Sequence, residues 1–240
     1  MHWASCWRRD LTVRLASKPL APGLALVAMA ITLLGCNSSG QVPMGASSWL
    51  IGPVIGGRDF SPGMPQHPTD NGKGGWYFDF PRSCGKQPDC SVHYVSARVS
   101  GIRPKQSVSA SFTVTASADA MFNCLLIPNN PEGYDPSAPP HVVLMLEHTG
   151  DDQEMTKEFW RYFAYGDRVA LKSGTYNVTV PLTPSRWVDV LGKPGDSKMS
   201  DTLNNLGDVA VVFGGCGYAG HGVQMQQGAA RFALNSFSAD

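Results

Sequence analysis

The stretch SVSASFTVTA, residues 107–116, alternates apolar and small polar side chains with a period of two. In an extended chain Val108, Ala110, Phe112 and Val114 fall on one side, and the serines and threonines fall on the other. The alternation predicts a β-strand with one buried side and one side that faces solvent.

Similar period-two or apolar segments recur through the rest of the chain, separated by turn-rich stretches such as PNNPEGYDPSAPP. Together with residues 107–116 they give nine candidate strands. The other eight candidates are residues 76–80, 91–99, 121–127, 141–147, 158–165, 175–182, 208–214 and 230–237.

One short segment has a helical signature, SDTLNNLG at residues 200–207, which predicts a helix near 200–206 that ends at Gly207. A parallel doubly wound sheet needs a helix of about ten or more residues in nearly every crossover. Because such helices are absent from the sequence pattern, we predict an all-β fold, an antiparallel β-sandwich with jelly-roll topology.

The nine residues GGCGYAGHG, 214–222, contain the spacing G-x-G-x-x-G of dinucleotide-binding turns. That motif has meaning only between a strand and a helix of a βαβ unit. The 18 residues after Gly222 show no apolar helical stripe and leave no room for a helix followed by a strand. We therefore interpret 214–222 as a loop at a sheet corner.

The first 35 residues have the composition of a secretion signal. Four basic residues precede a 12-residue apolar core, residues 23–34, which is too short for a bilayer-spanning helix. Leu33-Leu34-Gly35-Cys36 resembles the lipobox of bacterial lipoproteins, which implies that Cys36 is lipidated and becomes the first residue of the mature chain. The resemblance implies membrane attachment through acyl chains such as palmitate. Asn37 gives no aspartate-type retention signal, which favours the outer membrane over the inner membrane.

The mature chain is expected to consist of a tether and one domain. Residues 36–48 hold the lipid anchor and a small, polar, flexible tether. Residues 49–240 form a single β-sandwich domain, with an irregular Gly- and Pro-rich lead-in up to about residue 75 in which Trp49 and Phe60 anchor the chain to the core.

Charge argues against nucleic acid as a partner. The whole chain holds 19 basic and 19 acidic residues, and removal of 1–35 takes away four basic residues and one acid, which leaves a net charge of −3. We find no stripe of lysine and arginine that could neutralise phosphates.

Four cysteines follow Cys36, an even number that suggests disulfides in an exported chain. Cys84 and Cys90 bracket the short segment GKQPD, so we pair them, and we pair Cys124 with Cys216. Three pairings are compatible with four cysteines.

Aromatic residues give the main functional indication. In EFWRYFAY, residues 158–165, alternation places Trp160 and Tyr162 on one side of the strand. On a solvent-facing side they would form a flat platform for a sugar ring. His221 lies between two glycines, where a ligand can approach the backbone closely. If the lead-in covers that side, the platform is absent.

Acidic residues cluster at EHTGDDQE, residues 147–154. Glu147, Asp151 and Asp152 are candidate ligands for a structural Ca²⁺ ion, and the same carboxylates could serve a glycoside hydrolase or lyase. The calcium-loop spacing is missing, and a solvated loop explains the acids equally well. No other cofactor is expected.

The C-terminal half is similar to the closing part of galactose-binding-like jelly rolls, including non-catalytic carbohydrate-binding modules. The order is a strand that ends in a polar turn, Trp187, a short leucine-containing helix, a strand that opens on Gly207-Asp208-Val209, and a last strand with Phe232, Leu234 and Phe237. The chain also resembles bacterial exported proteins of unknown role with WYFDFP and FGG…GHGV around such a domain. This resemblance implies glycan binding without carrying over any catalytic residue. Trp187 therefore joins Trp160, Tyr162 and His221 as a candidate ligand-binding residue.

The sequence thus predicts a lipid-anchored, non-catalytic protein of the bacterial cell envelope that binds a glycan or envelope polysaccharide. The first alternative is an envelope structural or assembly protein that binds a partner protein. The next is a glycoside hydrolase or lyase.

Overall fold

The computed structural model describes residues 41–52, 54–55, 58–82, 90–124, 137–151, 161–195, 197–215 and 222–240. All described elements belong to one unit, Asn37–Asp240. Among the described residues, no helix has both the length and the apolar character needed to cross a membrane. The signal peptide and Cys36 lie outside these ranges, so their assignment stays a prediction.

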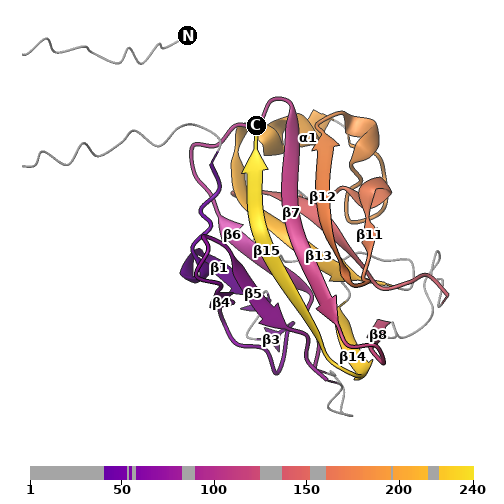
Figure 1. Cartoon of the computed structure of the whole chain (residues 1–240). Helices are drawn as coiled ribbons and strands as arrows, with labels where there is room; N and C mark the ends of the chain where they lie inside the picture. The colour runs from indigo at the N-terminus through magenta and orange to yellow at the C-terminus, as the bar shows by residue number, and fades with distance from the viewer. Residues whose placement is uncertain are drawn as a thin grey trace, which may run out of the picture. The chain divides into compact units, whose positions relative to one another are not determined.

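Two antiparallel sheets build the domain (Figure 1). The five-stranded sheet has the order β12 (Gly174–Pro181), β7 (Ser107–Ala116), β15 (Ala230–Ala239), β5 (Trp76–Asp79) and β4 (Thr69–Asp70). The six-stranded sheet has the order β1 (Trp49–Ile51), β6 (Tyr94–Arg98), β13 (Leu206–Gly214), β9 (His141–His148) and β10 (Arg161–Phe163), and β11 (Val169–Ala170) also pairs with β9.

Smaller elements complete the domain. Two short hairpins pair β8 (Met121–Cys124) with β14 (Val223–Gln227) and β2 (Val54–Ile55) with β3 (Arg58–Asp59). The α-helix of the described chain is α1 (Ser197–Asn204), and 3-10 turns lie at Ala46–Ser48 (η1), Tyr165–Asp167 (η2) and Pro184–Arg186 (η3). The predicted antiparallel all-β sandwich with one short helix is therefore confirmed, and the jelly-roll topology stays a prediction.

The residue pattern explains why the two sheets stack. In β7 the predicted alternation is present, because Val108, Ala110, Phe112 and Val114 are buried between less buried serines and threonines. Aromatic rings join the sheets: Phe213 of β13 lies edge-on to Phe78 of β5 and to Phe232 of β15, with centroids 5.4 and 5.1 Å apart. Such edge-to-face contacts add to the burial of apolar area in the core.

The lead-in differs from the prediction of an irregular segment. It contains the four short strands β1 to β4, of which β1 and β4 extend the two large sheets at their edges. Trp49 anchors the segment as expected: it is fully buried and packs 5.1 Å from Trp76 of the opposite sheet. Pairing at sheet edges satisfies backbone groups that a Gly- and Pro-rich sequence leaves without local partners.

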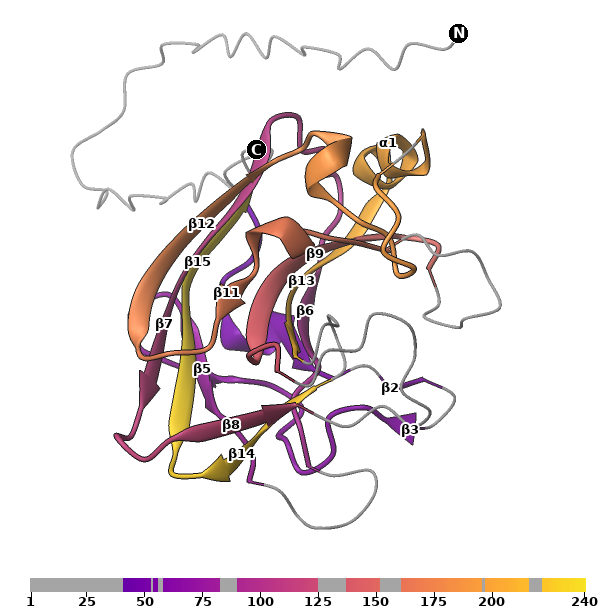
Figure 2. The same cartoon turned by 90° about the vertical axis from the view of Figure 1, so that its right-hand side faces the viewer.

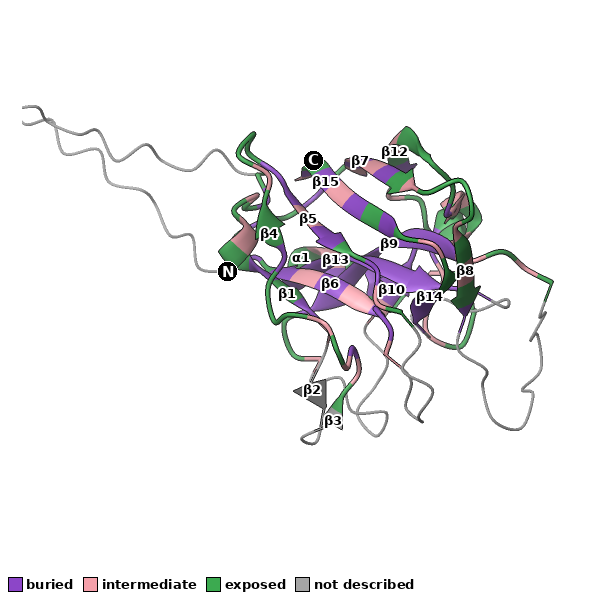
Figure 3. Cartoon of the chain, turned by 60° about the horizontal axis from the view of Figure 1, so that its bottom comes forward, coloured by how far each residue is buried: buried purple, intermediate pink, exposed green. Residues whose placement is uncertain are grey.

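The six-stranded sheet is covered on both sides. All eight residues of β9 are buried, with Val142, Leu144 and Leu146 in the core between the sheets. On the opposite side Val143 and Met145 join a second apolar cluster. That cluster also contains Phe163, Ala210 and Val212, with Tyr94, Tyr165, Val188 and Val190 packed against it. Figure 3 shows β9 as a continuously buried ribbon, whereas β15 alternates between buried and exposed residues.

The glycine motif follows β13, and the next described element is the strand β14. The structure therefore places the motif between two strands of antiparallel ladders. This agrees with its interpretation as a loop rather than a dinucleotide-binding turn. Residues 216–221 lie outside the described residues.

Candidate functional site

The two described aromatic residues predicted to bind a ligand, Tyr162 and Trp187, are not exposed. Tyr162 is 1% exposed and Trp187 is fully buried, both within the core between the sheets. The indole of Trp187 donates a hydrogen bond to the carbonyl of Pro181 at 2.9 Å. Trp160 and His221 lie outside the described residues. An exposed platform is therefore wrong at Tyr162, because its side of β10 faces the core, where it lies opposite Leu146. Trp187, which follows η3, is equally inaccessible to a surface ligand.

Glu147 and Asp151, the two predicted acids that are described, lie beside Arg161 of β10. Glu147 is 2% exposed, and β-sheet register places it opposite Arg161. The guanidinium of Arg161 donates two hydrogen bonds to the buried carboxylate of Asp151, at 2.9 and 3.1 Å. Asp152 lies outside the described residues. A bidentate arginine occupies oxygens that a cation would need.

We call Glu147, Asp151 and Arg161 the ionic cluster, and burial shifts the pKa values of the groups in and around it. Burial alone would lower the pKa of Arg161, but the hydrogen bond and charge of Asp151 outweigh that effect and raise it. Burial raises the pKa of Tyr94, a neighbour of the same groups, against the opposing charge of Arg161. No described group of three or more His, Cys, Asp or Glu residues could hold a metal ion. The described residues thus give the calcium and hydrolase hypotheses no support.

Two of the four cysteines assigned to disulfides fall within the described residues. Cys90 and Cys124 are described, while Cys84 and Cys216 lie outside the description, so both predicted pairings stay predictions. A Cβ atom placed on Gly215 would lie 2.7 Å from the Cβ of Cys124. The residue next to Cys216 therefore lies against Cys124, which favours the predicted pairing without establishing it.

A surface hollow of about 360 Å³ lies at one end of the five-stranded sheet. Charged and hydroxyl side chains and small residues from β5, β7, β15 and the turns beside them form its wall. Its lining consists of Asp79, Phe80, Arg82, Thr115, Ala116, Ser117, Gly228, Ala229, Ala230 and Arg231.

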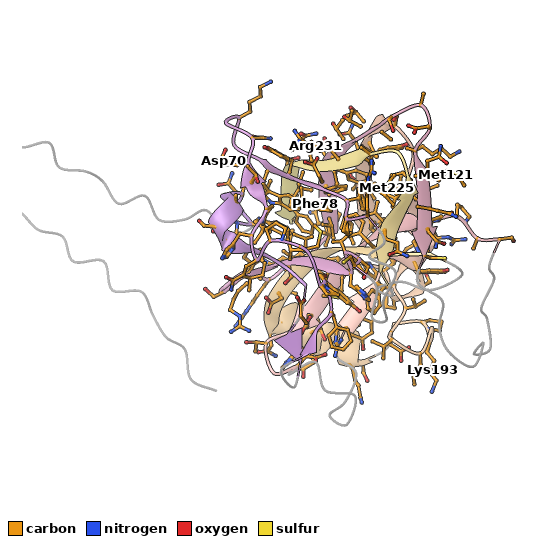
Figure 4. All side chains as sticks on the ribbon, turned by 90° about the horizontal axis from the view of Figure 1, so that it is seen from below. Asp70, Phe78, Met121, Lys193, Met225 and Arg231 are labelled. Carbon is orange, nitrogen blue, oxygen red and sulfur yellow. The ribbon has the colours of Figure 1, made fainter. Side chains whose placement is uncertain are left out.

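A planar ion pair forms one side of this hollow. Arg231 of β15 donates two hydrogen bonds to Asp79 of β5, at 2.7 and 2.9 Å. The centre of the guanidinium lies 3.9 Å from the ring centroid of Tyr77, so the charged plane stacks on an aromatic ring. The hydrogen bond with Asp79 raises the pKa of Arg231. In Figure 4 Arg231 lies on the outer side of β15, whereas Phe78 points into the interior.

Tight turns shape the opposite side of the hollow. Ser117 accepts a hydrogen bond from the backbone of Ala229 at 3.0 Å, and Gly228 has a φ of +72°. A Cβ atom on Gly228 would lie 2.5 Å from the hydroxyl of Ser117 and 2.8 Å from the Cα of Ala120. Nearby, the hydrogen bond from Ser117 lowers the pKa of Asp119, and the charge of Arg82 adds to this effect. Glycine is thus required where the wall bends.

A row of hydroxyl groups continues from the hollow along the same sheet. We call the outward side chains of β7 and β12 the hydroxyl face: Ser109, Ser111, Thr113, Thr115, Thr175 and Thr179. Two hydrogen bonds cross the strands within it, Ser109 to Thr179 at 2.9 Å and Thr113 to Thr175 at 3.1 Å. The hydroxyl face therefore presents donors and acceptors without charge, and it meets the hollow at Thr115.

Sequence reasoning did not identify this hollow. Alternation in WYFDF places Tyr77 and Asp79 on one side, and alternation in ARFALNSF separates Arg231 from Phe232 and Leu234. Those signals mark each residue as outward. They do not show that β5 and β15 are neighbours, which brings Asp79 opposite Arg231 across about 150 residues of sequence.

Comparison with known proteins leaves the fold and the site without a template. No family model matches the chain, and neither a curated protein nor a solved structure is significantly similar to it. The chemistry of the hollow and the hydroxyl face must therefore carry any functional conclusion.

Proposed function

We propose that the chain is a non-catalytic, lipid-anchored glycan-binding protein of the bacterial cell envelope. The observation that supports this proposal is the hollow at the end of the hydroxyl face, where Arg231 and Asp79 form a fixed plane beside Tyr77. The hollow replaces the surface around Tyr162 as the proposed binding site.

The side chains suit a ligand that carries many hydroxyl groups. Arginine provides only donors, ionised aspartate provides only acceptors, and threonine and serine provide both. A sugar presents adjacent hydroxyls that can donate to one partner while they accept from another, and hydrogen bonds to ionised groups are the stronger ones. The hydroxyl face allows a polymer to extend beyond the hollow.

Binding of soluble polysaccharides tests the proposal directly. We expect the full chain, purified in mild detergent, to bind at least one member of a panel by calorimetry, in Ca²⁺ or in chelator. Arg82→Ala should weaken this binding about tenfold or more, because a hydrogen bond to a charged group contributes about 1.5–3 kcal/mol. Arg103→Ala is the matched control. Arg103 is exposed and precedes the N-terminal end of β7, whereas the hollow lies at the C-terminal end of that strand.

Two further variants locate the site. Trp160→Ala and His221→Ala should leave affinity unchanged if the hollow is the site. If they abolish binding and Arg82→Ala does not, the sequence-based site is correct and the hollow is not. If the folded chain binds no glycan in the panel, the proposed function fails and an envelope assembly protein that binds a partner protein becomes the better hypothesis.

Attachment and export belong to the same proposal. We expect Cys36 to take up labelled palmitate, and Cys36→Ser to release the chain from the outer-membrane fraction. We also propose the disulfides Cys84–Cys90 and Cys124–Cys216, which peptide mapping without reduction would identify. The predicted flexible tether does not extend over residues 41–48, because Val42 is 4% exposed in the core and Gln41 pairs with Ser238.

A further inference from the structure

The free edge of β12 differs from the other edges of the two sheets. At the opposite edge of its sheet, β4 has two residues and includes Asp70. In the six-stranded sheet, β10 and β11 are three and two residues long, and β1 is bonded on its outer side, where Ile51 donates to the carbonyl of Gln66. Short, charged or covered edges are the ordinary protection against pairing with another chain.

Among the described residues, β12 has none of these protections along its length. It runs for eight residues, GTYNVTVP, without a charged side chain, and proline occurs only at its end. All eight residues pair with β7 in one continuous register that contains no bulge. Figure 2 shows β12 at the margin of the sandwich. A long, regular, uncharged edge strand is a template for strand addition.

The inward side of β12 is also incompletely covered. Tyr176 and Val178 point toward the core but are only half-buried. Their partners in β7 are Phe112 and Ala110, which are 1% and 4% exposed. The sandwich core therefore reaches solvent at this rim, and one more strand beside β12 would close it.

We propose that β12 pairs antiparallel with β12 of a second copy of this chain, about a two-fold axis at Asn177. This register places Tyr176 of one copy across from Val178 of the other, so the two half-buried side chains cover each other. It also places Thr175 across from Thr179 of the second copy. Aromatic and β-branched side chains are favourable cross-strand pairs.

The absence of charge favours a second copy of this chain as the partner that pairs with β12. Two copies of a strand whose charges have one sign would place like charges side by side, which destabilises a sheet. β12 carries no charge, so self-pairing has no such cost, and the interface is of the closed two-fold type. The resulting ten-stranded sheet joins the hydroxyl faces of both copies.

Charge substitutions on the exposed threonines test the pairing. The full chain in mild detergent is measured by analytical ultracentrifugation over a concentration series. Thr175→Lys with Thr179→Lys places two pairs of like charges across the axis, and we expect the dimer dissociation constant to rise about tenfold. Thr175→Lys with Thr179→Glu loses the same hydroxyls but creates two opposite-charge pairs, and should dimerise at least as well as the unchanged chain.

The outcomes separate this proposal from glycan binding, on which it does not depend. A chain that stays monomeric at all concentrations overturns it, and so does equal dimerisation of the two charge variants. Circular dichroism on each variant establishes that the sandwich is folded before the comparison. Loss of glycan binding in Arg82→Ala leaves the dimer unaffected.

Discussion

The outward faces of the two sheets differ in how far their arginine–aspartate ion pairs are exposed to solvent. Each contains an arginine held by two hydrogen bonds to an aspartate, Arg161 with Asp151 beside the six-stranded sheet and Arg231 with Asp79 on the five-stranded sheet. The first pair has side chains 12% and 0% exposed, and the second pair 46% and 63%. Identical chemistry thus sits in a dry layer on one face and in water on the other.

This difference decides which face can meet a ligand. On the six-stranded sheet the second apolar cluster and the ionic cluster occupy the outer side, so polar groups there are committed to one another. On the five-stranded sheet the outer side chains of β12 and β15 are mostly exposed, and the hollow lies at one end of that sheet. The side chains of the five-stranded sheet remain accessible for recognition.

The two ion pairs should respond very differently to truncation, and this is the largest expected effect. Arg161→Ala leaves the buried carboxylate of Asp151 without its bidentate partner, and we expect the free energy of unfolding to fall by about 3–5 kcal/mol. Arg231→Ala, the matched control, should cost less than about 1 kcal/mol because solvent screens the exposed pair. Urea denaturation measures both. Equal losses would contradict the contrast between the faces.

The next largest effect is expected on acidification, which should lower the free energy of unfolding through a buried histidine of the six-stranded sheet. His141 is 2% exposed, its Nε2 atom has no hydrogen-bond partner in the described part of the chain, and its ring makes a T-shaped contact with Tyr165. Burial lowers the pKa of His141, against a hydrogen bond with Pro139, and the charge of Arg168 lowers it further. Because the unfolded chain then binds more protons, stability should fall as pH drops below about 6.5, by up to about 1.4 kcal/mol per pH unit.

Substitution isolates this histidine. His141→Gln removes the titrating group and should flatten the loss of stability between about pH 6.5 and 5. If the slope of His141→Gln matches that of the unchanged chain, another group causes the acid sensitivity.

Asp208 should show a smaller effect of opposite sign. Burial raises the pKa of this carboxyl, although Arg98, 3.5 Å away, lowers it. The ionised form therefore disfavours folding at neutral pH, and the penalty is relieved as pH falls through the folded pKa. We expect Asp208→Asn to be more stable than the unchanged chain at pH 7, by less than about 1 kcal/mol, with a difference that shrinks at pH 4. Lower stability at pH 7 would contradict this.

The hydroxyl face should matter least for stability. Thr113→Ala removes hydrogen bonds to Thr175 and Asn235 at 3.1 and 3.2 Å in water, so we expect a loss below about 1 kcal/mol. A thermal melt should therefore change little. A large loss of stability would show that this face supports the fold and is not free for recognition.

Alternation along each strand was enough to predict most of the strands and the sandwich, because one buried side and one polar side give period two. It also separated Phe232 from Arg231 correctly. For β10 it divided the side chains into two sets, but it could not show that both sides of the neighbouring β9 are covered. The exposed platform at Tyr162 failed because alternation does not say which of the two sets faces inward, and Tyr162 lies in the core between the sheets.

By itself the sequence determined the fold class, the short helix before β13 and the strand before the glycine motif, since these depend on local periodicity and turn residues; it missed β14 after the motif. Only the tertiary structure decided which faces are dry, and that Asp79 meets Arg231 and Asp151 meets Arg161. The physical reason is that alternation fixes the two sides of a strand, whereas long-range pairing and the layer packed above fix what each side touches.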